Sequence, residues 1–110
     1  MTTLICINDL SEVDDEEYSP KKIIEKEAQN QDISSIFFYS NSLIDLCEEK
    51  KSSLWINYAS ELNIPLYVCI NSIKRRKLQN LIPSPVKVTG LGRLIEEVIN
   101  NEKTIVIGKL

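Results

Sequence analysis

Hydrophobic residues fall into five short runs along this chain, separated by longer and more polar stretches. Within each run the apolar residues follow one another rather than alternating with polar ones, which is typical of strands that are buried on both faces. The runs predict five strands, at residues 3–8, 33–39, 65–69, 86–89 and 104–107.

The stretches between these runs have helical features. Ser19 followed by Pro20 favours a helix start, and this helix is expected to extend to about residue 29. A short helical or irregular segment is expected at 41–51, followed by helices at 52–62 and 71–79. After residue 92, one helical face gathers four apolar residues: Leu94, Ile95, Val98 and Ile99.

Strands that alternate with helices predict an α/β protein, a three-layer α/β/α sandwich with a mainly parallel five-stranded sheet. The 110 residues suffice for one domain, spanning residues 1–110. No apolar run approaches the roughly 18 residues that cross a membrane. Residues 4–7 lack the length and basic flank of a signal peptide, so a cytoplasmic location is expected.

The chain contains no histidine and three cysteines, none in a C-x-x-C pair. The missing histidine excludes Ser-His-Asp and Cys-His catalysis and any histidine-ligated metal site. No metal and no cofactor are expected. The cysteines are expected to be free thiols in a reducing compartment, so any nucleophile must be activated by its surroundings.

Cys69 is the candidate nucleophile because it ends the third predicted strand, just before a predicted helix. Reactive groups collect at the carboxyl ends of parallel strands, and a helix N-terminus stabilises a thiolate. Its position alone leaves open the commoner alternative, a buried inert cysteine. Cys6 is expected to pack inside a strand, and the neighbouring Glu48 and Glu49 are expected to raise the pKa of Cys47.

The net charge is −3, yet residues 62–95 contain no Asp or Glu. Lys74, Arg75 and Arg76 follow Cys69 and are expected to form an electropositive rim near the thiol that docks partners. An ordinary solvated face is the alternative. The basic stretch has no interleaved aromatic residues, so direct nucleic-acid binding is disfavoured. The acidic residues 9–17 are interpreted as a solvated loop rather than a metal site, and they disfavour a phosphate-binding, flavodoxin-like module.

Gly90 and Gly92 lack the spacing of a phosphate-binding loop. They predict a tight turn, or a close backbone approach beside the Cys69 loop. With their neighbours they also contribute to a resemblance. Residues 34–39 (SSIFFY), 64–70 (IPLYVCI), 88–96 (VTGLGRLIE) and 104–107 (TIVI) resemble, in order and spacing, blocks of the DsrE/TusD-like sulfurtransferase family, the DsrE/DsrF-like sulfur-relay proteins.

This resemblance implies a sulfur-relay protein in which Cys69 accepts a persulfide and passes sulfane sulfur to a partner thiol. It implies a sulfur-carrier donor, an acceptor protein and a homo- or hetero-oligomer of related subunits, acting in tRNA 2-thiouridine formation or in sulfur oxidation. The family also contains subunits without the cysteine, so a non-catalytic scaffold subunit is the alternative. The chain departs from the family in its N-terminal third and in the short connection at 77–85.

Overall fold

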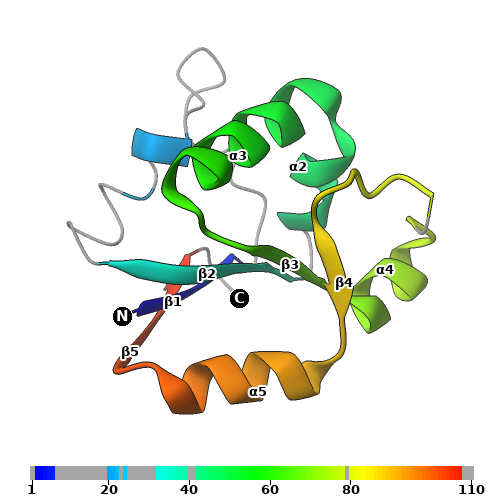
Figure 1. Ribbon diagram of the computed structural model, residues 1–110. Helices are drawn as coiled ribbons and strands as arrows, with labels where there is room; N and C mark the ends of the chain where they lie inside the picture. Colours follow the sequence, from blue (N-terminus) through cyan, green and yellow to red (C-terminus); the bar gives the residue numbers. More distant parts are fainter. Residues whose placement is uncertain are drawn as a thin grey trace.

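A single parallel sheet organises the computed structural model, which describes residues 2–6, 20–22, 24, 32–39, 42–78 and 80–107. Its strands are β1 (Thr2–Cys6), β2 (Ile33–Phe38), β3 (Leu66–Cys69), β4 (Lys87–Thr89) and β5 (Lys103–Ile107). They lie in the order β4-β3-β2-β1-β5, and each neighbouring pair is parallel (Figure 1). The predicted α/β class with a parallel sheet is confirmed.

The helices lie on opposite sides of this sheet. They are α2 (Leu43–Cys47), α3 (Glu49–Leu62), α4 (Ile70–Arg76) and α5 (Leu91–Asn100). Figure 1 shows α2 and α3 over one face, α5 across the other, and α4 beyond the end of β3. None of the helices in the described ranges is long and apolar enough to cross a membrane.

Part of the predicted N-terminal helix is also seen. Residues 20–22 and 24 are helical, and the Ile24 side chain is buried. The rest of that predicted helix lies outside the described residues, as do the acidic residues 9–17 and the last two residues of the first predicted strand.

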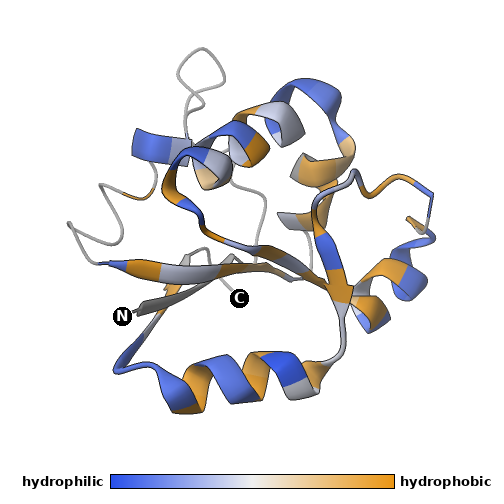
Figure 2. Cartoon of the chain, in the orientation of Figure 1, coloured by the Kyte–Doolittle hydropathy of each residue, from blue (hydrophilic) through white to orange (hydrophobic). Residues whose placement is uncertain are grey.

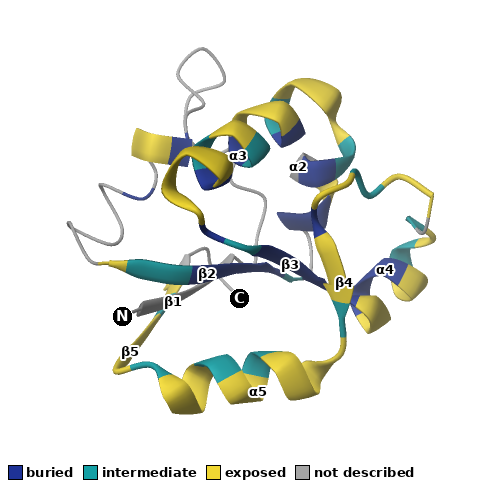
Figure 3. Cartoon of the chain, in the orientation of Figure 1, coloured by how far each residue is buried: buried dark blue, intermediate teal, exposed yellow. Residues whose placement is uncertain are grey.

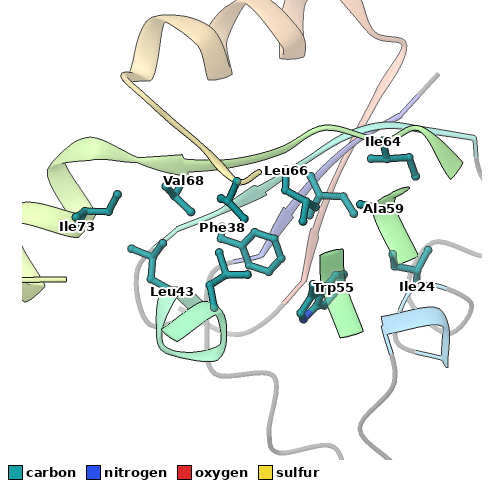
Figure 4. Packing of buried hydrophobic residues seen from close by; sticks show 12 residues of the cluster. Ile24, Phe38, Leu43, Trp55, Ala59, Ile64, Leu66, Val68 and Ile73 are labelled. Atoms are coloured by element: carbon teal, nitrogen blue, oxygen red, sulfur yellow. The ribbon is translucent and has the colours of Figure 1, made fainter. Parts of the chain in front are cut away.

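The main hydrophobic core lies between the sheet and the helices α2 and α3 (Figure 4). Trp55 of α3 is completely buried, and its ring meets the Phe38 ring edge-on, with centroids 5.1 Å apart. Side chains alternate between the two faces of a strand, so β2 and β3 send every second residue into this core. These are Ile36 and Phe38 from β2, and Leu66 and Val68 from β3.

The opposite face of the sheet carries a smaller aromatic pair. Phe37 and Tyr67 lie on neighbouring strands, are buried, and stack with ring centroids 4.8 Å apart. Two residues beyond Tyr67, strand alternation places Cys69 on this same face, the one that α5 crosses. The sheet thus separates the candidate nucleophile from the main core.

Two helix boundaries differ from the prediction. The α4 helix was expected at 71–79 but ends at Arg76, because Lys77 takes a left-handed conformation (φ 56°) and donates its N–H to the carbonyls of Ile73 and Lys74. Such a residue ends a helix by capping its last carbonyls. The α3 helix begins at Glu49, three residues before the predicted start at 52.

Candidate functional site

Cys69 occupies the junction of a strand and a helix, as predicted. It is the last residue of β3 and the N-cap residue of α4, with an extended backbone (φ −80°, ψ 126°). The extended conformation carries the chain out of the sheet before the helix starts. The seven-residue α4 has no acidic residue in its first turn, so no carboxylate there opposes a thiolate.

The structure brings a second predicted segment beside this cysteine. Cys69 pairs with Thr89 across the β3–β4 ladder, and Gly90 follows at the start of α5. The Thr89 hydroxyl donates to the Gly90 carbonyl at 3.1 Å. The carboxyl ends of adjacent parallel strands lie at the same edge of a sheet. The segments around Cys69 and Gly90, residues 64–70 and 88–96, therefore meet at this edge.

Neither glycine at this edge is needed for the conformation seen. Gly90 has an ordinary extended backbone (φ −89°, ψ 177°), and Gly92 lies within α5. A Cβ atom on either residue would have no neighbour within 4 Å among the described parts of the chain. No described part of the chain approaches either glycine closely, so their predicted role beside the Cys69 loop stays a prediction.

The Cys69 side chain is nearly covered, with 6% of its surface exposed. Its neighbour Ile70 is 37% exposed, and Leu91, which follows Gly90, is 44% exposed. Attack on a donor sulfur requires an unhindered thiolate. With 6% of Cys69 exposed, a reactant can reach this thiol only after local movement that uncovers the sulfur.

The predicted basic rim lies at the far end of the helix that Cys69 starts. Lys74, Arg75 and Arg76 form the last turn of α4, where they favourably face the negative end of the helix dipole. At about 1.5 Å per residue, they stand roughly 8–10 Å further along the helix axis than Cys69. Arg76 donates to the Ser72 carbonyl at 3.5 Å. The helix leads these cations away from the strand end rather than folding them back over it.

The sequence did not single out Arg93, which joins α5 to the sheet near the site. Its guanidinium donates to the Tyr67 hydroxyl at 3.0 Å and lies 5.3 Å from the centre of that ring. The hydrogen bond to Tyr67 is the main cause that raises the pKa of Arg93 further. Glu96 and Glu97 follow Arg93 at the three- and four-residue spacing of ion pairs within a helix. Their carboxylates lie 3.8 and 3.7 Å from the Arg93 guanidinium. The Tyr67 contact had no local signal.

An open pocket of about 470 Å³ lies at the opposite end of β3 from the cysteine. Its lining includes Asn63, which caps α3, Pro65 just before β3, and Lys87 at the start of β4. The pocket is therefore separate from the edge of the sheet where Cys69 lies, at the carboxyl end of β3. In the described ranges, no group of three or more His, Cys, Asp or Glu residues could hold a metal ion.

Cys47, at the end of α2, has a raised thiol pKa, as predicted, but the cause is burial rather than the charges of Glu48 and Glu49. Burial disfavours the thiolate, so in a Cys6→Ser/Cys69→Ser chain Cys47 should be alkylated more slowly than a free thiol at pH 7.5. As the pH is raised, the alkylation rate of Cys47 should continue to increase at pH values where the alkylation rate of a free thiol has become constant. Replacing Glu48 by Gln should leave this profile unchanged, whereas a clear acceleration would restore the charge explanation.

Comparison with known proteins agrees with this geometry. The crystal structure of the ychN protein from E. coli is similar over 97% of this chain and 99% of that one, with a TM-score of 0.65 and 13% sequence identity. At this identity the likeness concerns the fold. No curated protein sequence matches. The model of the DsrE/DsrF-like family matches residues 23–107, which include the Cys69 edge and all but the first strand. The chain therefore belongs to the DsrE/DsrF-like family.

Proposed function

We propose that this protein is a sulfurtransferase that carries sulfane sulfur as a persulfide on Cys69. The observation that supports this most is the place of Cys69 at the carboxyl end of β3, beside Thr89 and Gly90, in a chain of a family associated with sulfur relay. Reactive groups of open parallel sheets gather at this edge. The Cys69 thiol is also on the face opposite the main core, so its chemistry can proceed without opening that core.

The transfer is a pair of thiol exchanges at sulfur. The Cys69 thiolate attacks the outer sulfur of a donor persulfide, a new S–S bond forms, and the donor leaves as its own thiolate. The acceptor thiolate then attacks the outer sulfur of the Cys69 persulfide, and Cys69 leaves as a thiolate. No electrons are gained or lost overall, so the cycle needs no cofactor and no second cysteine in this chain.

The proposed partners are those that membership of the DsrE/DsrF-like family suggests. A sulfur-carrier protein supplies the persulfide, a downstream protein with a free thiol accepts it, and related subunits form a homo- or hetero-oligomer with this one. The sulfur then enters tRNA 2-thiouridine formation or sulfur oxidation. The direct test is intact-mass measurement after incubation with a persulfide donor: the chain should gain one sulfur atom, which a reductant removes.

A second candidate role is that of a non-catalytic scaffold subunit, and the burial of Cys69 favours it. Only 6% of Cys69 is exposed, and the adjoining turn of α4 carries no basic side chain. Many reactive cysteines lie in an exposed, electropositive setting, and Cys69 lacks that setting. A chain that gains no sulfur from the donor, while still assembling with related subunits, would favour this role over persulfide transfer.

The basic end of α4 should guide the acidic partners of such a relay. Reversing two charges with Arg75→Glu and Arg76→Glu should slow association with a donor about tenfold at low salt, because complementary charge mainly accelerates encounter. Added salt should reduce the difference between the two chains. Association rates measured by stopped-flow at two salt concentrations would test this.

A matched control for this experiment is the pair Lys21→Glu and Lys50→Glu, which reverses two exposed charges elsewhere. Thermal unfolding of each chain should be compared, because cations at the end of α4 also stabilise the helix dipole. If the transfer rate changes neither with salt nor with the Arg75/Arg76 charge reversal, this surface is only a solvated face.

A further inference from the structure

The pocket at the amino end of β3 is formed by three segments that are far apart along the chain. Its walls are the second half of α3, the start of β3 with the residues just before it, and the entry into β4. Its volume of about 470 Å³ falls within the range of roughly 300–1,000 Å³ that small-molecule sites occupy. The size alone therefore admits a small organic ligand.

The pocket is open because β4 is too short to cover the start of β3. The ladder between these strands begins with Tyr67 and Lys87, so Leu66, the first residue of β3, has no partner in β4. Figure 3 shows β3 buried and most of β4 exposed, as expected for a three-residue strand at the edge of the sheet. Pro85 lines the pocket two residues before β4, and it has no N–H with which to lengthen the ladder.

The floor of the pocket is apolar and belongs to the main hydrophobic core. Ala59, Ile64 and Leu66 line it and are 4%, 8% and 4% exposed. Core side chains are closely packed, so this floor keeps its shape without a ligand. An apolar body that covers the floor releases water from it, which favours binding.

The rim of the pocket on the side of α3 is polar. Figure 2 shows that α3 carries both hydrophobic and hydrophilic residues. Two of the hydrophilic residues in this region, Ser60 and Asn63, are exposed and line the pocket. Their spacing of three residues places them on the same side of the helix. A hydroxyl and an amide at this rim can hydrogen-bond to a polar group of a ligand.

The side of the pocket formed by β3 and β4 is positive. Lys87 is exposed, and its ammonium group lies 5.9 Å from the centre of the Tyr67 ring. The Arg93 guanidinium lies 5.3 Å from the same ring centre. Among the described residues that line the pocket there is no Asp or Glu, and those of β3 and β4 belong to the acid-free residues 62–95. This side therefore attracts an anion.

We propose that this pocket binds a small carboxylate with an apolar body, whose carboxylate group faces Lys87. The buried floor receives the body. Lys87 supplies most of the charge, because Glu96 and Glu97 lie 3.8 and 3.7 Å from Arg93 and largely offset it. The site is separate from Cys69 and does not depend on persulfide chemistry.

The end of α3 decides both the orientation and the class of the ligand. The pocket lies at the carboxyl end of this helix, which carries the negative end of its dipole and has no basic residue in its last turn. The anionic group is therefore directed away from α3 and toward Lys87. A nucleotide fits less well, because several phosphate charges would face one lysine without the N–H groups of a helix N-terminus.

2-Naphthoate is a suitable probe, and 2-naphthamide is its uncharged match of the same shape. In amide NMR titrations of the full chain, 2-naphthoate should shift the signals of Ala59, Ser60 and Leu66, which line the pocket. Its dissociation constant should be on the order of 1 mM, the affinity expected for about thirteen non-hydrogen atoms. 2-Naphthamide should bind about threefold more weakly, because it lacks the charge that Lys87 attracts.

Two pairs of variants test the charge and the space separately. Lys87→Gln should abolish the preference for 2-naphthoate, whereas Lys103→Gln, at the start of the opposite edge strand, should keep it. Ser60→Trp should fill the pocket from its exposed rim and weaken both probes at least tenfold. Ser53→Trp, exposed two turns earlier on α3, should change neither. Thermal unfolding of each variant checks that the chain remains folded.

The result does not depend on whether sulfur is transferred, since Cys69→Ser should bind both probes as the unmodified chain does. The proposal is overturned if neither probe shifts the pocket signals at about 10 mM. Shifts confined to α5, whose residues Ile95 and Ile99 are also exposed and apolar, would equally overturn it. So would a Lys87→Gln chain that still prefers 2-naphthoate, or a Ser60→Trp chain that binds as tightly as Ser53→Trp.

Discussion

A Cys69→Ser chain should gain no sulfur from a persulfide donor and should stop relay to an acceptor thiol, while the unmodified chain gains one sulfur atom. Serine cannot hold sulfane sulfur, so the expected loss is complete rather than partial. Intact-mass measurement before and after reductant would record both results. Transfer to an acceptor would be followed as mass gained by the acceptor.

The substitution should leave the fold intact. Cys69 is the N-cap residue of α4 and at present makes no side-chain capping bond. Serine is one of the preferred N-cap residues and is close to cysteine in size, so the junction of β3 and α4 tolerates it. An unchanged thermal midpoint would separate lost chemistry from lost structure.

The other two cysteines provide the matched controls. Cys47→Ser should still take up sulfur, because burial holds the Cys47 thiol in its neutral form. Cys6→Ser should also load; that side chain lies outside the described residues, so its predicted packing role stays a prediction. Equal loading of the Cys69→Ser chain and the unmodified chain would contradict the assignment of Cys69.

Replacing Trp55 by Ala should lower the free energy of unfolding by about 3–5 kcal/mol, the usual loss for a large buried aromatic residue. Trp55 is 0% exposed and meets the rings of Phe38 and Tyr58, with centroids 5.1 and 6.5 Å away. Small domains are stable by only about 5–15 kcal/mol. The variant should therefore unfold at a much lower urea concentration.

Leu54→Ala is the control for this experiment, because Leu54 precedes Trp55 on α3 but is 36% exposed. It should cost less than about 1 kcal/mol, since little apolar surface is lost from the core. Unfolding in urea should be monitored by circular dichroism, because the Trp55→Ala variant has no tryptophan whose fluorescence could report unfolding. Similar midpoints for the two variants would mean that Trp55 does not hold α3 on the sheet.

The local pattern of the sequence was sufficient for the elements and for one feature of the site. Apolar, β-branched runs predicted strands near their observed positions, because such residues suit a sheet covered on both sides. The same reasoning placed Cys69 correctly at the end of β3, before α4. The helix at 71–79 was predicted too long, because sequence periodicity gave no sign that Lys77 would adopt a left-handed conformation.

Only the tertiary structure decided which segments meet. Strand order is set by contacts between residues far apart in the sequence, so the pairing of Cys69 with Thr89 had no local signal. The rotation of α5 was equally hidden: its apolar face was predicted, yet Ser35 and Tyr67 hold its polar side and leave Ile95 and Ile99 outside. Periodicity fixes which side of a helix is apolar, whereas the partners that bind each side depend on how the whole chain packs.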